Sequence, residues 1–204
     1  CLTAVFWGKV LDHIISMAYA NNGLLAGLVA ITAGCSTVEP EGAFVIGILG
    51  GSIYVLASRT LVALKIDDVV DAVPVHMANG AFGVIATGFF ASKGGYRTAY
   101  YAEYDKEDLD DDARTEACAG VFYGGRGNML GANIVLILAI TAWVGTLATI
   151  MFFGIHYTVG LRVSAEMEEV GMDASKHGGS VHGAELFMQG DAPKPAAGHG
   201  HKAE

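Results

Sequence analysis

The chain has 204 residues, of which 52% are apolar and only 16% are charged, whereas a soluble domain averages about 25% charged residues. With 28 glycines, 4 prolines and a mean hydropathy of +0.43, this composition disfavours a soluble enzyme or a disordered chain and is typical of packed membrane helices. The net charge of −9, the 12 scattered basic residues and the three cysteines without a paired spacing do not favour nucleic-acid binding, a disulfide framework or a cysteine metal site.

Stretches without charge mark the candidate membrane spans. A span needs about 20 mostly apolar residues, and four stretches of near that length or longer lack Asp, Glu, Lys and Arg. They predict transmembrane helices over residues 14–35, 42–60, 68–91 and 128–161, preceded at 1–8 by the end of an earlier span. Because the chain begins with a cysteine and carries no recognisable signal peptide, we expect a piece of a longer membrane protein.

Two segments are polar. Residues 93–125 contain an acidic run from Glu103 to Glu116, for which we expect a solvated, partly disordered extramembrane loop. An EF-hand calcium site is the alternative, but the run lacks the glycine that such a loop needs at its turn. The predicted organisation is a transmembrane domain over 1–161 and a polar tail over 162–204, disordered at its end.

His76 is the strongest candidate for chemistry in the spans. It is the only ionisable side chain between Asp71 and Lys93, and ionisable groups at membrane depth are costly and usually face a pathway or a partner. A neutral imidazole both donates and accepts a hydrogen bond, which suits a small hydrogen-bonding solute or a proton. The alternative is a buried histidine satisfied by a backbone carbonyl. Pro74, two residues earlier, lacks a backbone donor and predicts a kink.

Three acids precede the same span, at Asp67, Asp68 and Asp71. They fit a helix N-terminal cap, because acids favour the positive end of a helix. They also fit the DDxxD magnesium–diphosphate site of a membrane prenyltransferase. That enzyme needs a second acidic cluster to complete the metal sphere, and the chain has no such pattern, so we expect no metal site. His156, near the end of the last span, is interpreted as structural.

Four stretches of the sequence resemble the ammonium transporter (Amt/Mep/Rh) family, specifically its C-terminal half and its eukaryotic members. They begin NNGLLAGLVAITAGC, DDVVDAVPVHMANG, GVFYGGRGNMLGAN and VGLRVSAEMEEVGMDASKHGG, and they follow one another in the family's order. They cover residues 21–51, 67–91, 120–145 and 159–179. Met77 and Pro74 depart from the family pattern, since many members have glycine at these positions.

The resemblance implies an all-α membrane protein: the C-terminal portion of an eleven-helix fold, with about four full transmembrane helices and the end of another. Family members form homotrimers in the lipid bilayer, with a pore through each subunit. Within about 20 residues of the span ends, where the positive-inside rule applies, Lys and Arg are balanced between the two sides, so orientation rests on the resemblance. It implies a plasma-membrane protein with a cytosolic C-terminus.

The resemblance also assigns roles to individual residues. It makes His76 the second of two pore histidines, which meet midway along a narrow apolar pore. Ala72 matches a pore-lining position, and Asp68 matches an acid with a capping role at the vestibule. Ser175 matches a position that some eukaryotic members phosphorylate to close the pore. The first histidine, the gate and the outer recruitment site belong to the half of the fold outside these residues.

The sequence therefore predicts a fragment of a protein that transports ammonium or ammonia across a membrane. It predicts no enzyme activity, no cofactor and no nucleic-acid partner. An ammonium sensor built on the same scaffold is the first alternative, and the prenyltransferase is the second.

Overall fold

The computed structural model describes residues 1–101 and 111–170, and this part of the chain is helical apart from one isolated bridge between Val38 and Ala91. The prediction of an all-α fold is confirmed. The helices are α1 (Leu2–Asp12), α2 (Met17–Thr32), α3 (Pro40–Ala63), the π-helix η1 (Val73–Ala78), α4 (Asn79–Phe90), α5 (Lys93–Tyr101), α6 (Asp111–Cys118), the 3₁₀-helix η2 (Val121–Tyr123), α7 (Asn128–Thr158) and α8 (Ala165–Val170).

The chain divides into two compact units, Cys1–Gly145 and Thr146–Glu204. The first contains α1 to α6 and the first part of α7. In the second, the described residues are the end of α7 and α8. The candidate site lies wholly in the first unit.

The predicted spans correspond to helices, with differences at their ends. Within the described residues, three helical segments are long and apolar enough to cross a membrane: Pro40–Ala63, Val73–Phe90 and Asn128–Thr158. The helix in the first predicted span, α2, has only 16 residues. It begins after Ser16, whose side chain accepts a hydrogen bond from the backbone N–H of Ala18, and turns follow it from residue 33.

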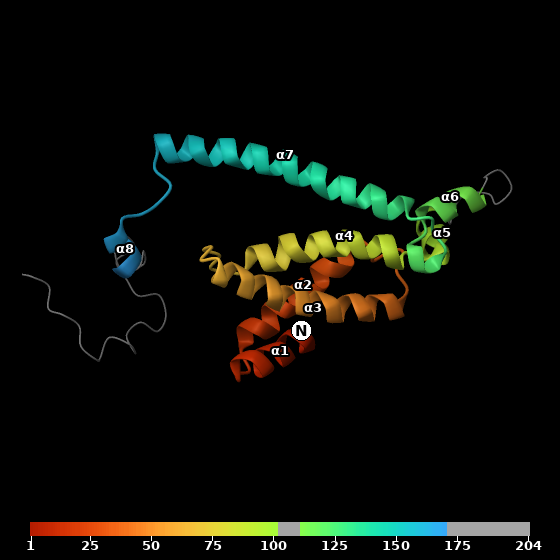
Figure 1. Ribbon diagram of the computed structural model, residues 1–204, viewed down its shortest axis with the longest axis horizontal. Coiled ribbons are helices and arrows are strands. Elements are labelled where there is room, and N and C mark those ends of the chain that lie inside the picture. The colour runs from red at the N-terminus through yellow and green to blue at the C-terminus, as the bar shows by residue number, and fades with distance from the viewer. Residues whose placement is uncertain (102–110, 171–204) are drawn as a thin grey trace, which may run out of the picture. The chain divides into compact units, whose positions relative to one another are not determined.

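Small residues bring the helices of the first unit together. In Figure 1 α2, α3 and α4 lie close to one another, and α2 contacts α1, α3 and α4. The buried contacts are made largely by alanine and glycine, as with Ala26 and Ala30 of α2 and Ala86 of α4. A Cβ added at Gly83 would collide with the carbonyl oxygen of Ala30. Such close approach is how membrane helices gain van der Waals contact, because lipid provides no hydrophobic force between them.

Polar contacts fasten one end of the bundle. The Asp12 carboxylate, at the end of α1, accepts a hydrogen bond from the Tyr19 hydroxyl and pairs with Arg59 at 2.6 Å. The bond from Tyr19, followed by that from Arg59, lowers the pKa of Asp12 below its usual range. These contacts tie together the end of α1, the start of α2 and the last turns of α3.

The opposite end is fastened by Ser92. Its hydroxyl donates to Glu39 Oε1 at 2.6 Å, and its backbone N–H donates to the carbonyl of Thr37 at 2.8 Å. Glu39 is also the N-cap residue of α3. The loop before α3 and the end of α4 are therefore held side by side.

The polar insert is more ordered than expected wherever the structure describes it. The expected loop over 93–125, predicted to be solvated and partly disordered, contains α5, α6 and η2 among its described residues. Apolar packing explains the order. The Phe122 ring lies 5.1 Å from that of Phe90 and 5.5 Å from that of Phe89, between centroids. Thr115 and Ala119 are each 1% exposed. Most of the acidic run, residues 102–110, lies outside the described residues.

The outer faces of these helices carry large apolar side chains. Phe44 and Leu56 of α3 and Trp143 of α7 are each about 70% exposed. In water such continuous apolar surface would be unfavourable. It suits lipid or contact with further transmembrane helices.

The glycine packing gives a first prediction. Gly83→Ala should destabilise the bundle by about 1–3 kcal/mol, because the new Cβ would push α4 away from the Ala30 backbone. Gly47→Ala is the matched control, since nothing lies within 4 Å of a Cβ there and alanine raises helix propensity. Heating in detergent, followed by size-exclusion detection of folded protein, measures both. Equal melting temperatures for the two variants would contradict this account of the packing.

Candidate functional site

His76 lies in η1 and lines an open cavity of about 440 Å³. The cavity is walled by residues from α2, the η1–α4 segment and the first part of α7. They are Thr32, Ala33, His76, Met77, Gly80, Ala81, Val84, Ile137, Ile140 and Thr141. Apart from the imidazole, the polar side chains of this wall are two threonines, so the histidine lies in mostly apolar surroundings.

Among the residues that the structure describes, none hydrogen-bonds to the His76 imidazole. The expected alternative, a histidine satisfied by a neighbouring backbone carbonyl, is therefore not the arrangement seen here. A neutral imidazole in this position has one donor and one acceptor available to a small molecule in the cavity.

The turn that carries His76 is a π-helix rather than a simple kink. Its six residues, VPVHMA, include Pro74 in its first turn, where the absent backbone N–H costs little. π-turns contain one extra residue per turn and are frequent at functional sites. The regular helix α4 begins at Asn79, directly after this turn.

Asp68 caps the start of this segment. Its two carboxylate oxygens accept the backbone N–H groups of Ala72 and Val73, each at 2.8 Å. A carboxylate at this place satisfies amides that have no partner within the helix and favours the helix dipole. Ala72 is exposed and lies one helical turn before His76.

Asp71 connects the same segment to two other helices. Its carboxylate accepts hydrogen bonds from the hydroxyls of Tyr54 and Ser58 in α3, both at 2.8 Å, and from the amide of Asn22 in α2 at 3.3 Å. The Asp71 backbone is left-handed, with a φ of 57°, a conformation that aspartate tolerates better than most residues.

This geometry leaves the prenyltransferase interpretation without support. Asp68 is occupied by backbone amides and Asp71 by three side chains, so the acids do not converge on one site. Among the described residues no group of three His, Cys, Asp or Glu side chains is placed to hold a metal ion.

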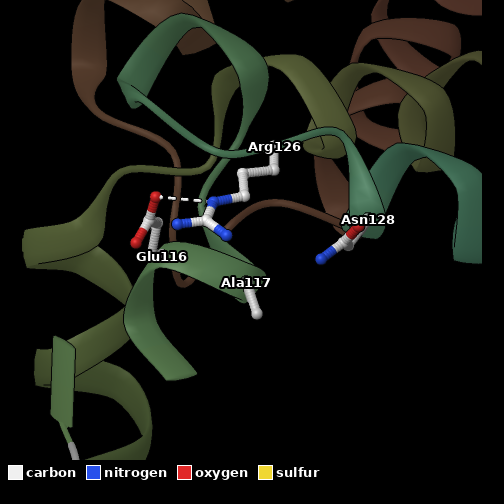
Figure 2. A pocket seen from close by; sticks show the side chains of 4 residues that line it. All are labelled: Glu116, Ala117, Arg126 and Asn128. Carbon is white, nitrogen blue, oxygen red and sulfur yellow. Dashed lines mark hydrogen bonds and ion pairs between the residues drawn. The ribbon is translucent and has the colours of Figure 1, made fainter. Parts of the chain in front are cut away.

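A second hollow, in the polar insert, differs from the His76 cavity. Figure 2 shows its four lining residues, Glu116, Ala117, Arg126 and Asn128, and its volume is about 100 Å³. The Arg126 guanidinium is paired with the Glu116 carboxylate at 3.0 Å. Its charge is thus balanced within the insert, and the hollow has no counterpart to the unpaired imidazole.

Sequence reasoning placed some of these residues and missed others. His76 lies in η1 and lines the cavity, whereas Ala72 and Asp68 precede η1 and are not among the cavity-lining residues. Ser175 lies outside the described residues. The role of Asp71 as the acceptor for three side chains was missed, because it was grouped with its acidic neighbours. Its position, five residues before the histidine, was the available signal.

Comparison with known proteins agrees with this geometry. A profile of the Ammonium Transporter Family matches residues 1–182. The chain belongs to this family. It is 37% identical over 181 residues to ammonium transporter 1 member 4 of Arabidopsis thaliana, an alignment that covers 89% of this chain and 34% of the relative.

Solved structures of the family share the fold. The structure of Mep2 from Saccharomyces cerevisiae superposes with a TM-score of 0.70 at 28% identity, covering 86% of this chain and 36% of that one. A structure titled Sensor Amt Protein gives a TM-score of 0.67 at 26% identity, covering 86% of this chain and 38% of that one. The chain thus spans about a third of the length of these relatives. It is an integral membrane protein of a transporter family, not of an enzyme family.

The Asp71 contacts give a second prediction. Asp71→Ala should destabilise this ammonium transporter family member by about 2–4 kcal/mol, because it leaves the Tyr54 hydroxyl, in a side chain 2% exposed, without its acceptor. Asp71→Asn is the control, since its amide oxygen still accepts and asparagine also tolerates a positive φ. Thermal unfolding in detergent should rank wild type, the Asn variant and the Ala variant in falling order. An alanine variant as stable as wild type would refute this role.

Proposed function

We propose that this chain contributes to the transport of ammonium or ammonia across a membrane, along an apolar path lined by His76. One observation carries the proposal. In a chain of the Ammonium Transporter Family, the imidazole of a membrane helix faces an apolar cavity and has no hydrogen-bond partner among the described residues.

The physics of transfer supports this choice of substrate. Ammonium is a cation, and moving it bare into an apolar cavity carries a large desolvation cost. Ammonia is neutral and needs only hydrogen-bond partners, which an imidazole provides through one donor and one acceptor nitrogen. The cavity beside His76 therefore favours passage of the neutral molecule, with the proton left behind or relayed by histidine.

The neighbouring residues take supporting roles in this proposal. Ala72 lines the path one turn before His76, where a small side chain leaves room for the solute. Asp68 holds the start of the helix through the amides of Ala72 and Val73 and belongs to the vestibule at that end.

The complete transporter requires more than these residues. We propose that the chain is the C-terminal part of a longer polypeptide, because it spans about a third of the relatives it matches. In this proposal residues 1–161 form part of the membrane domain of a homotrimer in the plasma membrane. Residues 162–204 form a cytosolic regulatory tail, and phosphorylation of Ser175 adds negative charge that disturbs its docking.

An ammonium sensor is the second candidate. The observation that favours it is the likeness to the structure titled Sensor Amt Protein. A sensor would keep the same fold and the same histidine cavity and would couple binding to signalling instead of passage.

A histidine variant tests the transport proposal. In the complete polypeptide, expressed in cells without their own ammonium uptake, His76→Ala should lower ammonium uptake by about tenfold or more, or change the charge carried per molecule. His156→Ala is the matched control, because it removes an imidazole from α7 that is not among the residues lining the cavity. Uptake and membrane current are measured per folded protein at the membrane.

Two outcomes would contradict the transport proposal. Uptake and current that are unchanged in His76→Ala would remove the histidine from the path. Wild-type protein that reaches the membrane without supporting growth on low ammonium would favour the sensor.

A further inference from the structure

Asn79 is a polar side chain sealed inside the helix bundle next to the His76 turn. It is 0% exposed. Its side-chain amide donates to the carbonyl oxygen of Pro74 at 2.8 Å, and its backbone N–H donates to the carbonyl of His76. One residue thus holds two carbonyls of the π-turn, one on each side of Val75.

The direction of His76 depends on this turn. In a regular helix, residues three and four apart lie on one face. Here Gly80 shares the cavity with His76, whereas Asn79 is fully buried. Consecutive residues of a helix lie about 100° apart around its axis, which allows Asn79 to face inward while Gly80 faces the cavity. A π-turn contains more residues per turn than a regular α-helix, so a turn that relaxed to regular α-helix would rotate His76 relative to α4.

The neighbouring helices prevent the Asn79 side chain from moving away. A Cβ added at Gly50 of α3 would lie 3.1 Å from Asn79 Oδ1 and 3.0 Å from the Cβ of Ala30 in α2. The amide is therefore packed between α2 and α3 beside Gly50. A side chain at position 50 would be in tight contact with it.

Stability alone does not explain an asparagine here. Asn79 Oδ1 is buried and has no hydrogen-bond partner among the described residues. An unsatisfied buried acceptor is destabilising, and an apolar residue of similar volume would fill the same space without that cost. What an apolar residue could not replace is the hydrogen bond that the Asn79 side-chain N–H donates to the Pro74 carbonyl.

We propose that Asn79 is a positioning residue for His76: its amide fixes the π-turn so that the imidazole points into the cavity. This inference rests on the proposed function for its effect on transport, but its geometric part does not. The Asn79 side chain itself does not contact the cavity.

The first test separates position from transport. Every cysteine of the complete polypeptide, Cys1, Cys35 and Cys118 among them, is replaced by serine, and His76→Cys provides a single thiol in the cavity. Asn79→Leu should then change the rate at which a small methanethiosulfonate reagent labels that thiol by about tenfold. Thr32→Cys in place of His76→Cys is the control for general loosening, because Thr32 lines the same cavity from α2 and lies outside the π-turn.

The outcomes of labelling decide the geometric claim. A changed rate at position 76 with folded protein retained supports the proposal. An unchanged rate at 76, or equal changes at 76 and 32, would overturn it. Should Asn79→Leu fail to fold, Asn79→Asp is labelled instead, since its carboxylate keeps the shape but cannot donate to Pro74 when ionised.

The second test measures ammonium uptake in the complete polypeptide with its natural cysteines. Asn79→Leu should lower uptake per folded protein by about tenfold and alter its pH profile between about pH 5 and 8, while its melting temperature stays at or above that of wild type. A purely structural role would lower the melting temperature and leave uptake per folded molecule unchanged.

His76→Ala in the same uptake assay distinguishes failure of the positioning role of Asn79 from failure of the transport proposal. If His76→Ala lowers uptake and Asn79→Leu does not, the positioning role is wrong and the transport proposal stands. If neither lowers uptake while labelling at 76 still changes, the transport proposal fails and the geometric claim stands.

Discussion

The candidate site depends on one constraint: the start of the η1 segment is attached to the rest of the helix bundle. Asp68 satisfies two backbone amides at the beginning of the η1 segment. Asp71 binds side chains from α2 and α3. The two carboxylates act on different partners, one local and one distant, and they lie eight and five residues before His76. They fix where the segment starts and which neighbours it faces, so the position of the imidazole is set from this end.

Packing by small residues makes that attachment necessary. The core between α2, α3 and α4 is built from alanine and glycine more than from large side chains, and helices in lipid have no hydrophobic force to hold them together. Hydrogen bonds between side chains of different helices then supply a larger share of the stability of the bundle. Trp7 donates to Ser52 at 3.0 Å between α1 and α3, and Asn133 of α7 donates to the Val84 carbonyl of α4 at 2.7 Å. Close backbones and a few polar links replace a conventional core.

The sequence predicted the helices well and their ends less well. Gaps between charges located α3 and the η1–α4 segment, because a span must exclude charge over its whole length. The same criterion extended the first span beyond the end of α2 at Thr32, since the turns that follow also lack charge. It also assigned the polar insert to a loop, although aromatic contacts such as that of Phe122 with Phe90 order part of it. A stretch without charged residues shows which residues can lie in lipid, but it does not show at which residue a helix ends.

Sequence reasoning identified only some residues of the candidate site, and their roles in transport stay predictions. His76 was evident because an ionisable residue within an apolar span is rare. Asn79 was not, because an uncharged amide near glycines gives no sign of its burial, and the π-turn has no pattern in a single sequence. The three acids were similar in sequence, but tertiary contacts gave them different roles. Asp71 became the common acceptor only because Tyr54 and Ser58 of α3 face it.

His76 and Asn79 show how one short segment combines a fixed backbone with an available ring. An imidazole bonded to a protein carbonyl would be held in one tautomer, whereas the ring in the cavity can exchange its donor and acceptor nitrogens with a small solute. For both imidazole nitrogens to stay free for a solute, the backbone of the turn that carries His76 must be held by another residue. The Asn79 amide provides this through the Pro74 carbonyl. The polar group that stabilises the turn and the polar group that faces the cavity are therefore separate residues, one buried in the bundle and the other lining the cavity.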